Sequence, residues 1–247
     1  MNIDQQEVTK FAELAEKWWD KNGDFKPLHV INPLRANYIE DKITCNGKEI
    51  LDVGCGGGLL SEALHDFGGN VTGIDAAGPG IKIAQLHADK NKKAITYIES
   101  TAEKLLCSSD KKYDVVTCLE VLEHVPDPKL LVQACCDLLK PNGHLFLSTI
   151  NKTPRSWITA IVGAEYIFNI LPKGTHEFEK FIKPSSLASY VREANLELFN
   201  SIKLSIIGLA YLYGLFVTIP NNILFILKNS NTTSIPLNKR ADVVIFL

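Results

Sequence analysis

Two carboxylates and an imidazole lie close together near the middle of the chain. Glu120, Glu123 and His124 form the pattern E-x-x-E-H. On a helical turn they fall at positions i, i+3 and i+4 and share one face. Carboxylate and imidazole groups can ligate a divalent cation such as Mg²⁺. The histidine can instead act as a general base, or the residues can simply cap and pack a turn.

A glycine-rich stretch, ILDVGCGGGLL at residues 50–60, predicts a ligand-binding loop between a buried strand and a helix. Backbone N–H groups at a helix N-terminus favour an anionic or carboxylate-bearing ligand. Gly54 and Gly56 let the ligand approach the backbone closely, and Asp52 precedes them. Asp75 ends the next strand, about 20 residues after the first glycine, where a carboxylate can bind ribose hydroxyls. The pattern therefore indicates a nucleoside cofactor.

The glycine spacing bears on which cofactor binds. A dinucleotide-binding loop has the spacing G-x-G-x-x-G, but Leu59 stands at the third glycine position here. The loop instead follows G-x-G-x-G. NAD is therefore the leading alternative rather than the first choice.

Strands and helices alternate through the central part of the chain, which predicts a mostly parallel sheet of the α/β class with right-handed crossovers. Ligands of such sheets bind beyond the carboxyl ends of the strands. We expect the first five strands at residues 50–53, 70–74, 95–99, 113–119 and 144–150, and two more at 196–207 and 241–247. The expected edge carries the glycine loop, Asp75, Thr101, Ala102, Leu119 and the E-x-x-E-H segment.

The first 46 residues have helical spacing and no strand character, so we expect them to form a lid over the cofactor site. One helix is predicted from Glu7 to Asp20 and another ending near Ile43. Arg35 is expected near the start of the second helix, where a cation gains nothing from the helix dipole. A carboxylate partner would explain it, and an ordinary surface arginine is the alternative.

Two apolar stretches follow the fifth strand. Thr153 to Leu171 is too short to span a bilayer comfortably, and it is flanked by Lys152, Arg155 and Lys173. It suits a membrane-interface segment or a groove for a substrate tail, with an ordinary core helix as the alternative. Leu204 to Leu227 is long enough to span, but Pro220 interrupts it. We therefore divide the chain into a lid (1–46) and a second domain (47–247), with an insertion at 152–182 and an atypical apolar tail at 208–240.

Composition sets further bounds. A chain of 247 residues can form one α/β domain with a sizeable core. Its net charge is −2 with acids and bases interspersed, so it lacks the basic stripe expected of a nucleic-acid-binding protein. Its six cysteines include no C-x-x-C pair and its first residues lack the apolar core of a signal peptide, which favours reduced thiols and a cytoplasmic location.

Several strings together resemble one family. They are KFAELAEKWWD, GDFKPLHVINPLRANYI, ILDVGCGGGLLSEAL, VVTCLEVLEHVPDP, STINKTPRSW and LPKGTHEFEKFIKP. The D-x-G-x-G-x-G loop followed by Asp75 is similar to motifs I and II of class I S-adenosylmethionine-dependent methyltransferases. The whole set, from about Gln6 to Leu209, resembles the ubiquinone biosynthesis O-methyltransferases. After Leu209 the chain departs from the family pattern.

This resemblance implies a Rossmann-like three-layer sandwich that methylates a polyprenylated catechol and demethylubiquinol. It implies that Arg35, Gly54, Asp75 and Leu119 contact S-adenosylmethionine, and that the E-x-x-E-H segment holds a divalent cation. That cation would chelate the catechol and lower the pKa of the attacking hydroxyl, or His124 would act as base without it. Thr101 and Ala102 would lie near the adenine.

The same resemblance suggests peripheral contact with an anionic inner membrane and with other ubiquinone-biosynthesis proteins. Two rival functions remain. One is a methyltransferase for another lipid-like acceptor. The other is a non-catalytic cofactor-binding component of a biosynthetic complex, although such a component would need neither Asp52, Asp75 nor the E-x-x-E-H segment.

Overall fold

A computed structural model describes residues 2–23, 25–152, 178–194, 197–204 and 240–246. Its centre is a seven-stranded sheet in the order β3-β2-β1-β4-β5-β7-β6, and every neighbouring pair is parallel. The strands are β1 (Glu49–Val53), β2 (Asn70–Asp75), β3 (Thr96–Glu99), β4 (Tyr113–Leu119), β5 (Leu139–Ile150), β6 (Glu197–Leu204) and β7 (Arg240–Phe246).

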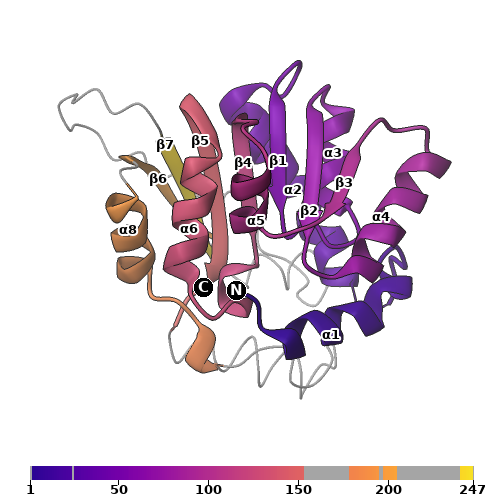
Figure 1. Cartoon of the computed structure of the whole chain (residues 1–247), viewed down its shortest axis with the longest axis horizontal. Coiled ribbons are helices and arrows are strands. Elements are labelled where there is room, and N and C mark those ends of the chain that lie inside the picture. Colours follow the sequence, from indigo (N-terminus) through magenta and orange to yellow (C-terminus); the bar gives the residue numbers. More distant parts are fainter. Residues whose placement is uncertain (1, 24, 153–177, 195–196, 205–239, 247) are drawn as a thin grey trace, which may run out of the picture.

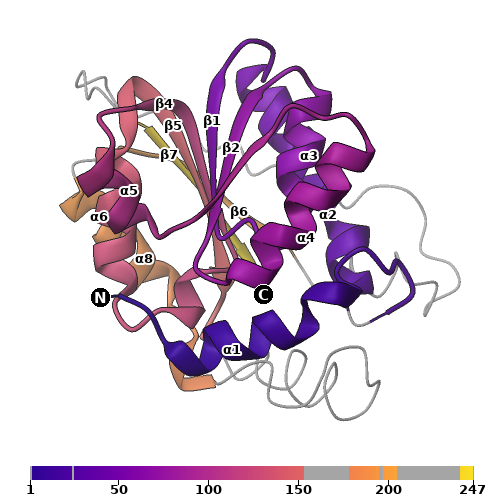
Figure 2. The ribbon, with the colours of Figure 1, turned by 45° about the vertical axis from the view of Figure 1, so that its right-hand side comes forward.

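Helices cover both faces of this sheet and make a three-layer sandwich (Figures 1 and 2). One layer contains α2 (Lys26–Ile43), α3 (Leu59–Asp66) and α4 (Gly78–Lys90). The other contains α5 (Ala102–Ser108), α6 (Pro128–Asp137) and α8 (Pro184–Glu193). The expected Rossmann-like α/β fold is thus confirmed.

The central strands are buried on both faces because adjacent residues point into different cores. Ile50 and Val115 pack in the cluster that includes residues of α2 and α3. Leu51 and Val116 pack in the cluster that includes residues of α5, α6 and α8. The apolar run that opens the glycine stretch was therefore correctly predicted to be a strand buried on both faces.

The start of the N-terminal segment crosses the edge of the sheet where the strands end (Figure 1), and its last helix packs on a face of the sheet. The segment consists of α1 (Gln5–Leu14), the 3-10 helix η1 (Ala15–Lys17) and α2. The first helix is shorter than predicted. The second begins at Lys26 and contains Pro33 in its interior, so Arg35 lies in mid-helix and not near the start. The expectation about the position of Arg35 is therefore wrong.

The boundary between α6 and β5 also differs from expectation. The helix ends at Asp137 and the strand begins at Leu139. Tyr113 pairs with Leu139, whereas Val115 already pairs with His144, so Lys140 to Gly143 bulge out of the register. A proline and an asparagine at positive φ (63°) suit such a bulge, which reads in sequence as a loop between elements.

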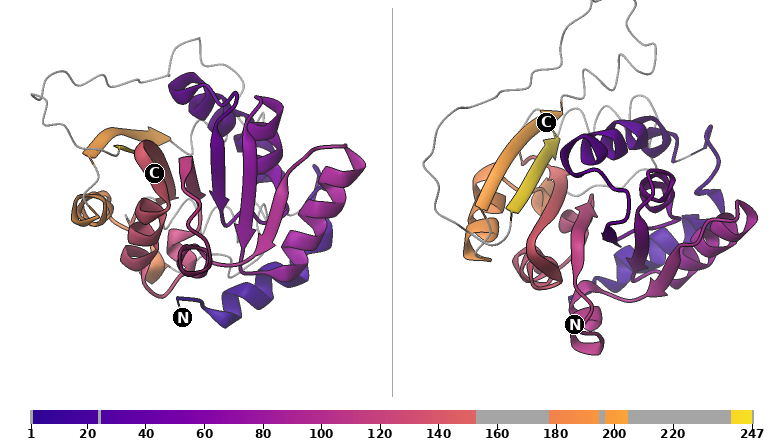
Figure 3. Two further views of the ribbon diagram at one scale, coloured as in Figure 1. Left: turned by 45° about the horizontal axis from the view of Figure 1, so that its top comes forward. Right: turned by 90° about the horizontal axis from the view of Figure 1, so that it is seen from above.

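The last two strands lie beside β5 at one end of the sheet, as Figure 3 shows. Strand β7 pairs with β5 on one side and β6 on the other. Both agree with the predicted positions to within a few residues. Most of the predicted insertion at 152–182 and nearly all of the tail at 208–240 lie outside the described residues, and the proposed domain division stays a prediction. Among the described residues, no helix has both the length and the apolar character needed to cross a membrane.

Candidate functional site

The glycine loop joins β1 to α3 through three residues with left-handed backbone. Gly54, Gly56 and Gly58 have φ values of 72°, 53° and 88°, a region that glycine enters without steric cost. The N–H groups of Gly54 and Cys55 both donate to the carbonyl of Ile74, at 2.8 and 3.0 Å, so the loop is tied to the end of β2. Burial raises the pKa of the Cys55 thiol well above its usual range, so this cysteine is no thiolate nucleophile.

Asp75, at the end of β2, is held by the backbone of the loop and of the following turn. Its Oδ2 accepts from the Gly56 N–H at 2.9 Å, and its Oδ1 accepts from the Ala77 N–H at 2.7 Å. Burial raises the pKa of this carboxyl, and the two backbone donors oppose the rise. A carboxylate offers about four acceptor positions, so the two bonds leave capacity for ribose hydroxyls. Asp75 therefore fits the nucleoside role that its spacing predicts.

Asp52 lies at the end of β1, just before the loop. Its side chain is buried, with Ser61 Oγ donating to Oδ2 at 2.6 Å and Thr117 Oγ1 donating to Oδ1 at 2.8 Å. Burial raises its pKa to about 6, against the effect of these hydroxyl bonds. The carboxyl thus joins β1, α3 and β4, which fixes the base of the glycine loop.

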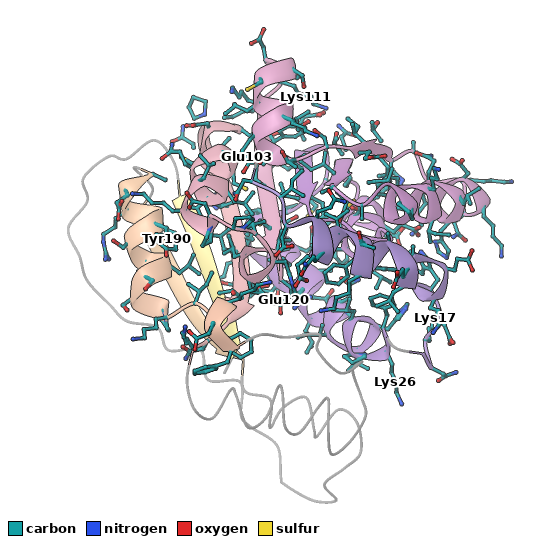
Figure 4. The ribbon with its side chains drawn as sticks, turned by 60° about the horizontal axis from the view of Figure 1, so that its bottom comes forward. Lys17, Lys26, Glu103, Lys111, Glu120 and Tyr190 are labelled. Atoms are coloured by element: carbon teal, nitrogen blue, oxygen red, sulfur yellow. The ribbon has the colours of Figure 1, made fainter. Side chains whose placement is uncertain are left out.

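Arg35 reaches the site from α2. Its Nη2 lies 3.2 Å from Oε1 of Glu120, which also accepts from Ser148 Oγ at 2.6 Å. Burial lowers the pKa of Arg35, while the negative charges of Glu120, Glu123 and Asp52 oppose that effect. Arg35 is therefore a largely but not fully buried cation with a carboxylate partner, and not an ordinary surface arginine. In Figure 4, Glu120 lies near the centre of the view, whereas Lys17 and Lys26 project outward at its edge.

His124 is held by the N-terminal helix. Its Nδ1 lies 3.0 Å from Oε2 of Glu7, and the ring of Phe11 contacts it edge-on at 5.1 Å between centroids. Burial acts to lower the pKa of His124, but the hydrogen bond to Glu7 and the charges of Glu123 and Glu7 raise it. The same hydrogen bond lowers the pKa of Glu7 to about 2. Lys180 Nζ, 3.2 Å from Oε1 of Glu7, completes the cluster.

The predicted metal triad is not formed. Glu120 has φ 60° and precedes the 3-10 helix η2 (Leu122–His124), so the three residues do not share one helical face. Glu120 faces Arg35 and Ser148, Glu123 accepts from Thr149 Oγ1 at 3.0 Å, and His124 faces Glu7. Within the part of the chain that the structure describes, no group of three or more His, Cys, Asp or Glu side chains could hold a metal ion. These donors do not fit a cation, and that expectation is corrected.

The remaining predicted residues lie at the same edge of the sheet. Thr101 caps α5, its hydroxyl accepting from the Lys104 N–H, and Ala102 is buried in the first turn of that helix. The Ser100 N–H donates to the carbonyl of Asp75 at 2.9 Å, which brings this turn to the end of β2. Leu119 is the last residue of β4. The parallel topology thus brings Thr101, Ala102 and Leu119 to the carboxyl edge of the sheet, as expected.

Two tryptophans of the N-terminal segment contact the glycine loop, which sequence patterns did not single out. A Cβ on Gly56 or on Gly57 would collide with the indole of Trp18. Trp19 Nε1 donates to the carbonyl of Gly57 at 2.9 Å. The adjacent W-W pair is the available signal, since two consecutive large aromatics are unusual in a segment expected to form a lid. Glu7 was also missed, although an acid on the apolar face of the first helix could have marked it.

Comparison with known proteins identifies the family. Residues 29–200 match the family described as a methyltransferase domain. The chain is 52% identical over 198 residues to the ubiquinone biosynthesis O-methyltransferase of Marinobacter nauticus, covering 79% of this chain and 83% of that protein. The chain belongs to the ubiquinone biosynthesis O-methyltransferase family. Another member, from Pseudomonas aeruginosa, is 50% identical over 210 residues, covering 85% and 88% of the two chains.

Solved structures agree with this family fold. The magnesium protoporphyrin IX methyltransferase of Synechocystis PCC 6803, solved with bound SAH, superposes with a TM-score of 0.61. The match covers 78% of this chain and 90% of that one at 19% identity, so it bears on the fold alone. This member of the ubiquinone biosynthesis O-methyltransferase family is therefore an enzyme with the fold of class I S-adenosylmethionine-dependent methyltransferases.

Proposed function

We propose that this O-methyltransferase transfers a methyl group from S-adenosylmethionine to a catechol hydroxyl of polyprenylated ubiquinone intermediates, including demethylubiquinol. The observation that carries the proposal is the glycine loop hydrogen-bonded to Asp75, in a chain about half identical to ubiquinone biosynthesis O-methyltransferases over most of its length. When bound, S-adenosylmethionine supplies an electrophilic methyl group on a sulfonium sulfur.

The cofactor would extend along the carboxyl edge of the sheet. Asp75 would accept from the ribose hydroxyls through its remaining lone pairs, and Thr101 and Ala102 would lie near the adenine. Gly54 and Leu119 would line the methionyl half. Arg35 would bind the methionyl carboxylate, which would compete with Glu120 for the guanidinium. A partly buried guanidinium that lies 3.2 Å from one carboxylate can also bind a second carboxylate.

The acceptor hydroxyl must lose its proton to become a good nucleophile, and His124 is the base available beside the edge. Glu7 contacts Nδ1 and would orient the imidazole for proton transfer. A carboxylate that orients a histidine in this way is the arrangement used by many acid–base catalysts. Glu123, bound to Thr149, and Glu120, bound to Arg35, would shape the acceptor side of the site.

A polyprenyl acceptor resides in the bilayer, so we place this enzyme at the cytoplasmic face of the inner membrane, in peripheral contact with anionic lipid. The support is the sequence of residues 152–173, an apolar run with basic residues at both ends. Other ubiquinone-biosynthesis proteins are natural partners, since they would pass on equally insoluble intermediates.

The direct test is turnover with a defined acceptor. The purified protein would be incubated with S-adenosylmethionine and a short-chain polyprenyl catechol, and the methyl ether would be detected by mass spectrometry. An Asp75→Ala variant, which loses the ribose acceptor, is the control and should form far less product, with circular dichroism checking that it folds. Cofactor binding without methylation of any catechol would contradict the proposed function and favour the non-catalytic component.

A further inference from the structure

The indole of Trp18 lies against the glycine loop. Atoms Cζ2 and Cη2 of its six-membered ring stand where a Cβ of Gly56 would be, and Cγ and Cδ1 stand where a Cβ of Gly57 would be. The indole nitrogen is bonded to Cδ1, beside Gly57, and to Cε2, which lies 3.0 Å from the Gly56 position. The N–H group therefore lies beside the link between these two glycines.

This N–H is buried without a partner. Trp18 is 8% exposed, and its Nε1 has no hydrogen-bond partner among the described residues. Its neighbours fix the ring in place, since Phe25 packs on it at 4.1 Å between centroids and His29 Nε2 contacts its carbonyl at 2.9 Å. Buried donors are nearly always paired in native proteins, so an unpaired one at a ligand loop indicates a missing acceptor.

The adjacent tryptophan provides an internal comparison. Trp19 donates its own Nε1–H to the carbonyl of Gly57 at 2.9 Å and stacks on His87 at 3.4 Å between centroids. Trp19 thus anchors the N-terminal segment to the loop and needs no ligand. The two indoles sit side by side in sequence, but only that of Trp18 still needs an acceptor from outside the described chain.

We infer that Trp18 is a cofactor-positioning residue whose indole N–H donates to the α-carboxylate of the methionyl group; the inference rests on the proposed function. Ribose is assigned to Asp75, which takes the Gly56 N–H on its own side of the loop. The carboxylate is the one negatively charged acceptor of the cofactor, and the glycine loop ends at the N-terminus of α3, where an anion is favoured. Arg35, from the same N-terminal segment, supplies the complementary positive charge.

Two ligands distinguish a hydrogen bond from Trp18 to the cofactor carboxylate from a general effect of the substitution on ligand binding. S-adenosylhomocysteine carries the amino-acid carboxylate, whereas 5′-methylthioadenosine has the same nucleoside and thioether without it. Trp18→Phe keeps a ring over the loop but removes the donor. Because hydrogen bonds to charged groups are strong, we expect calorimetry to show S-adenosylhomocysteine binding weakened about tenfold or more, and methylthioadenosine binding changed by less than about twofold.

The matched control is Trp19→Phe, which removes an indole N–H one residue away. We expect this variant to change the affinities for the two ligands by the same factor. If Trp18→Phe also changes both equally, or changes neither, the inference is overturned while the proposed function stands. If the wild-type protein does not bind S-adenosylhomocysteine at all, the proposed function itself fails.

A measurement on the wild-type chain keeps the inference testable if Trp18→Phe does not fold. The chain has three tryptophans, so ¹⁵N-indole labelling gives three N–H signals. Trp19→Phe and Trp157→Phe would assign that of Trp18 by exclusion. We expect its proton signal to move downfield on adding S-adenosylhomocysteine but not methylthioadenosine. No such difference between the two ligands would overturn the inference.

Discussion

Replacing Asp52 by asparagine should stabilise the protein increasingly from about pH 4 and fully above about pH 6. The carboxyl is buried at the base of the glycine loop, and burial raises its pKa from 3.8 to about 6. A rise of about two pKa units corresponds to about 3 kcal/mol, because each unit is worth about 1.4 kcal/mol. The free energy of unfolding is therefore lower by about this much when Asp52 is ionised in both states than when it is neutral in both.

The direction follows from the two pKa values. Below the unfolded value of 3.8 the carboxyl is neutral in both states, and its contribution to stability is fully present. As the pH rises through the folded value of about 6 that contribution is lost. Asparagine is neutral throughout and keeps one carbonyl acceptor, while either the Ser61 or the Thr117 hydroxyl can turn to accept from its amide.

Scanning calorimetry of the wild type and Asp52→Asn at several pH values tests this. We expect equal melting temperatures near pH 4, a difference that grows to about pH 6, and a plateau above it of about 6–12 °C in favour of the variant. The matched control is Asp114→Asn, because Lys140 holds the pKa of Asp114 below its usual value and this variant should lose stability instead. Parallel melting profiles for the wild type and Asp52→Asn would refute the reasoning.

Three further outcomes follow from the site. Asp75→Ala should weaken S-adenosylmethionine binding about tenfold or more by calorimetry, since hydrogen bonds to a carboxylate are lost, and an unchanged affinity would rule out the ribose role. His124→Gln should lower kcat for methyl transfer about 100-fold while S-adenosylhomocysteine affinity stays within about twofold, and full turnover would remove the general base. Mg²⁺ should leave the melting temperature unchanged, because the donors of the E-x-x-E-H segment do not converge; a rise that saturates with Mg²⁺ would show that they can.

The part of the site that sequence predicted well depends on local spacing. A strand, a glycine loop and an acid one strand later must meet at one edge of a parallel sheet, so Gly54 and Asp75 could be placed without coordinates. The apolar run of β1 was equally informative, because a strand buried on both faces has no polar alternation.

The part that sequence missed depends on contacts between distant residues. Glu7 and His124 are separated by 117 positions, and no pattern in either segment names the other. The E-x-x-E-H segment misled for a different reason, since Glu120 adopts positive φ and breaks the helical spacing on which the predicted shared face depends. The predicted start of the second helix was wrong because a proline usually marks the first turn of a helix. In the structure α2 begins at Lys26 and continues past Pro33.

The docking of α1 also has a consequence for the order in which the nascent chain acquires its structure. Its ten residues are too few to form a stable helix in isolation. Two partners of this part of the chain, His124 for Glu7 and the backbone of Asp127 for Asn2, are synthesised more than a hundred residues later. The contacts of Glu7 and Asn2 therefore cannot form until β4 and η2 have emerged. A chain interrupted before β4 would keep the contacts of Trp18 and Trp19 with the glycine loop but would lack these two anchors of its first residues.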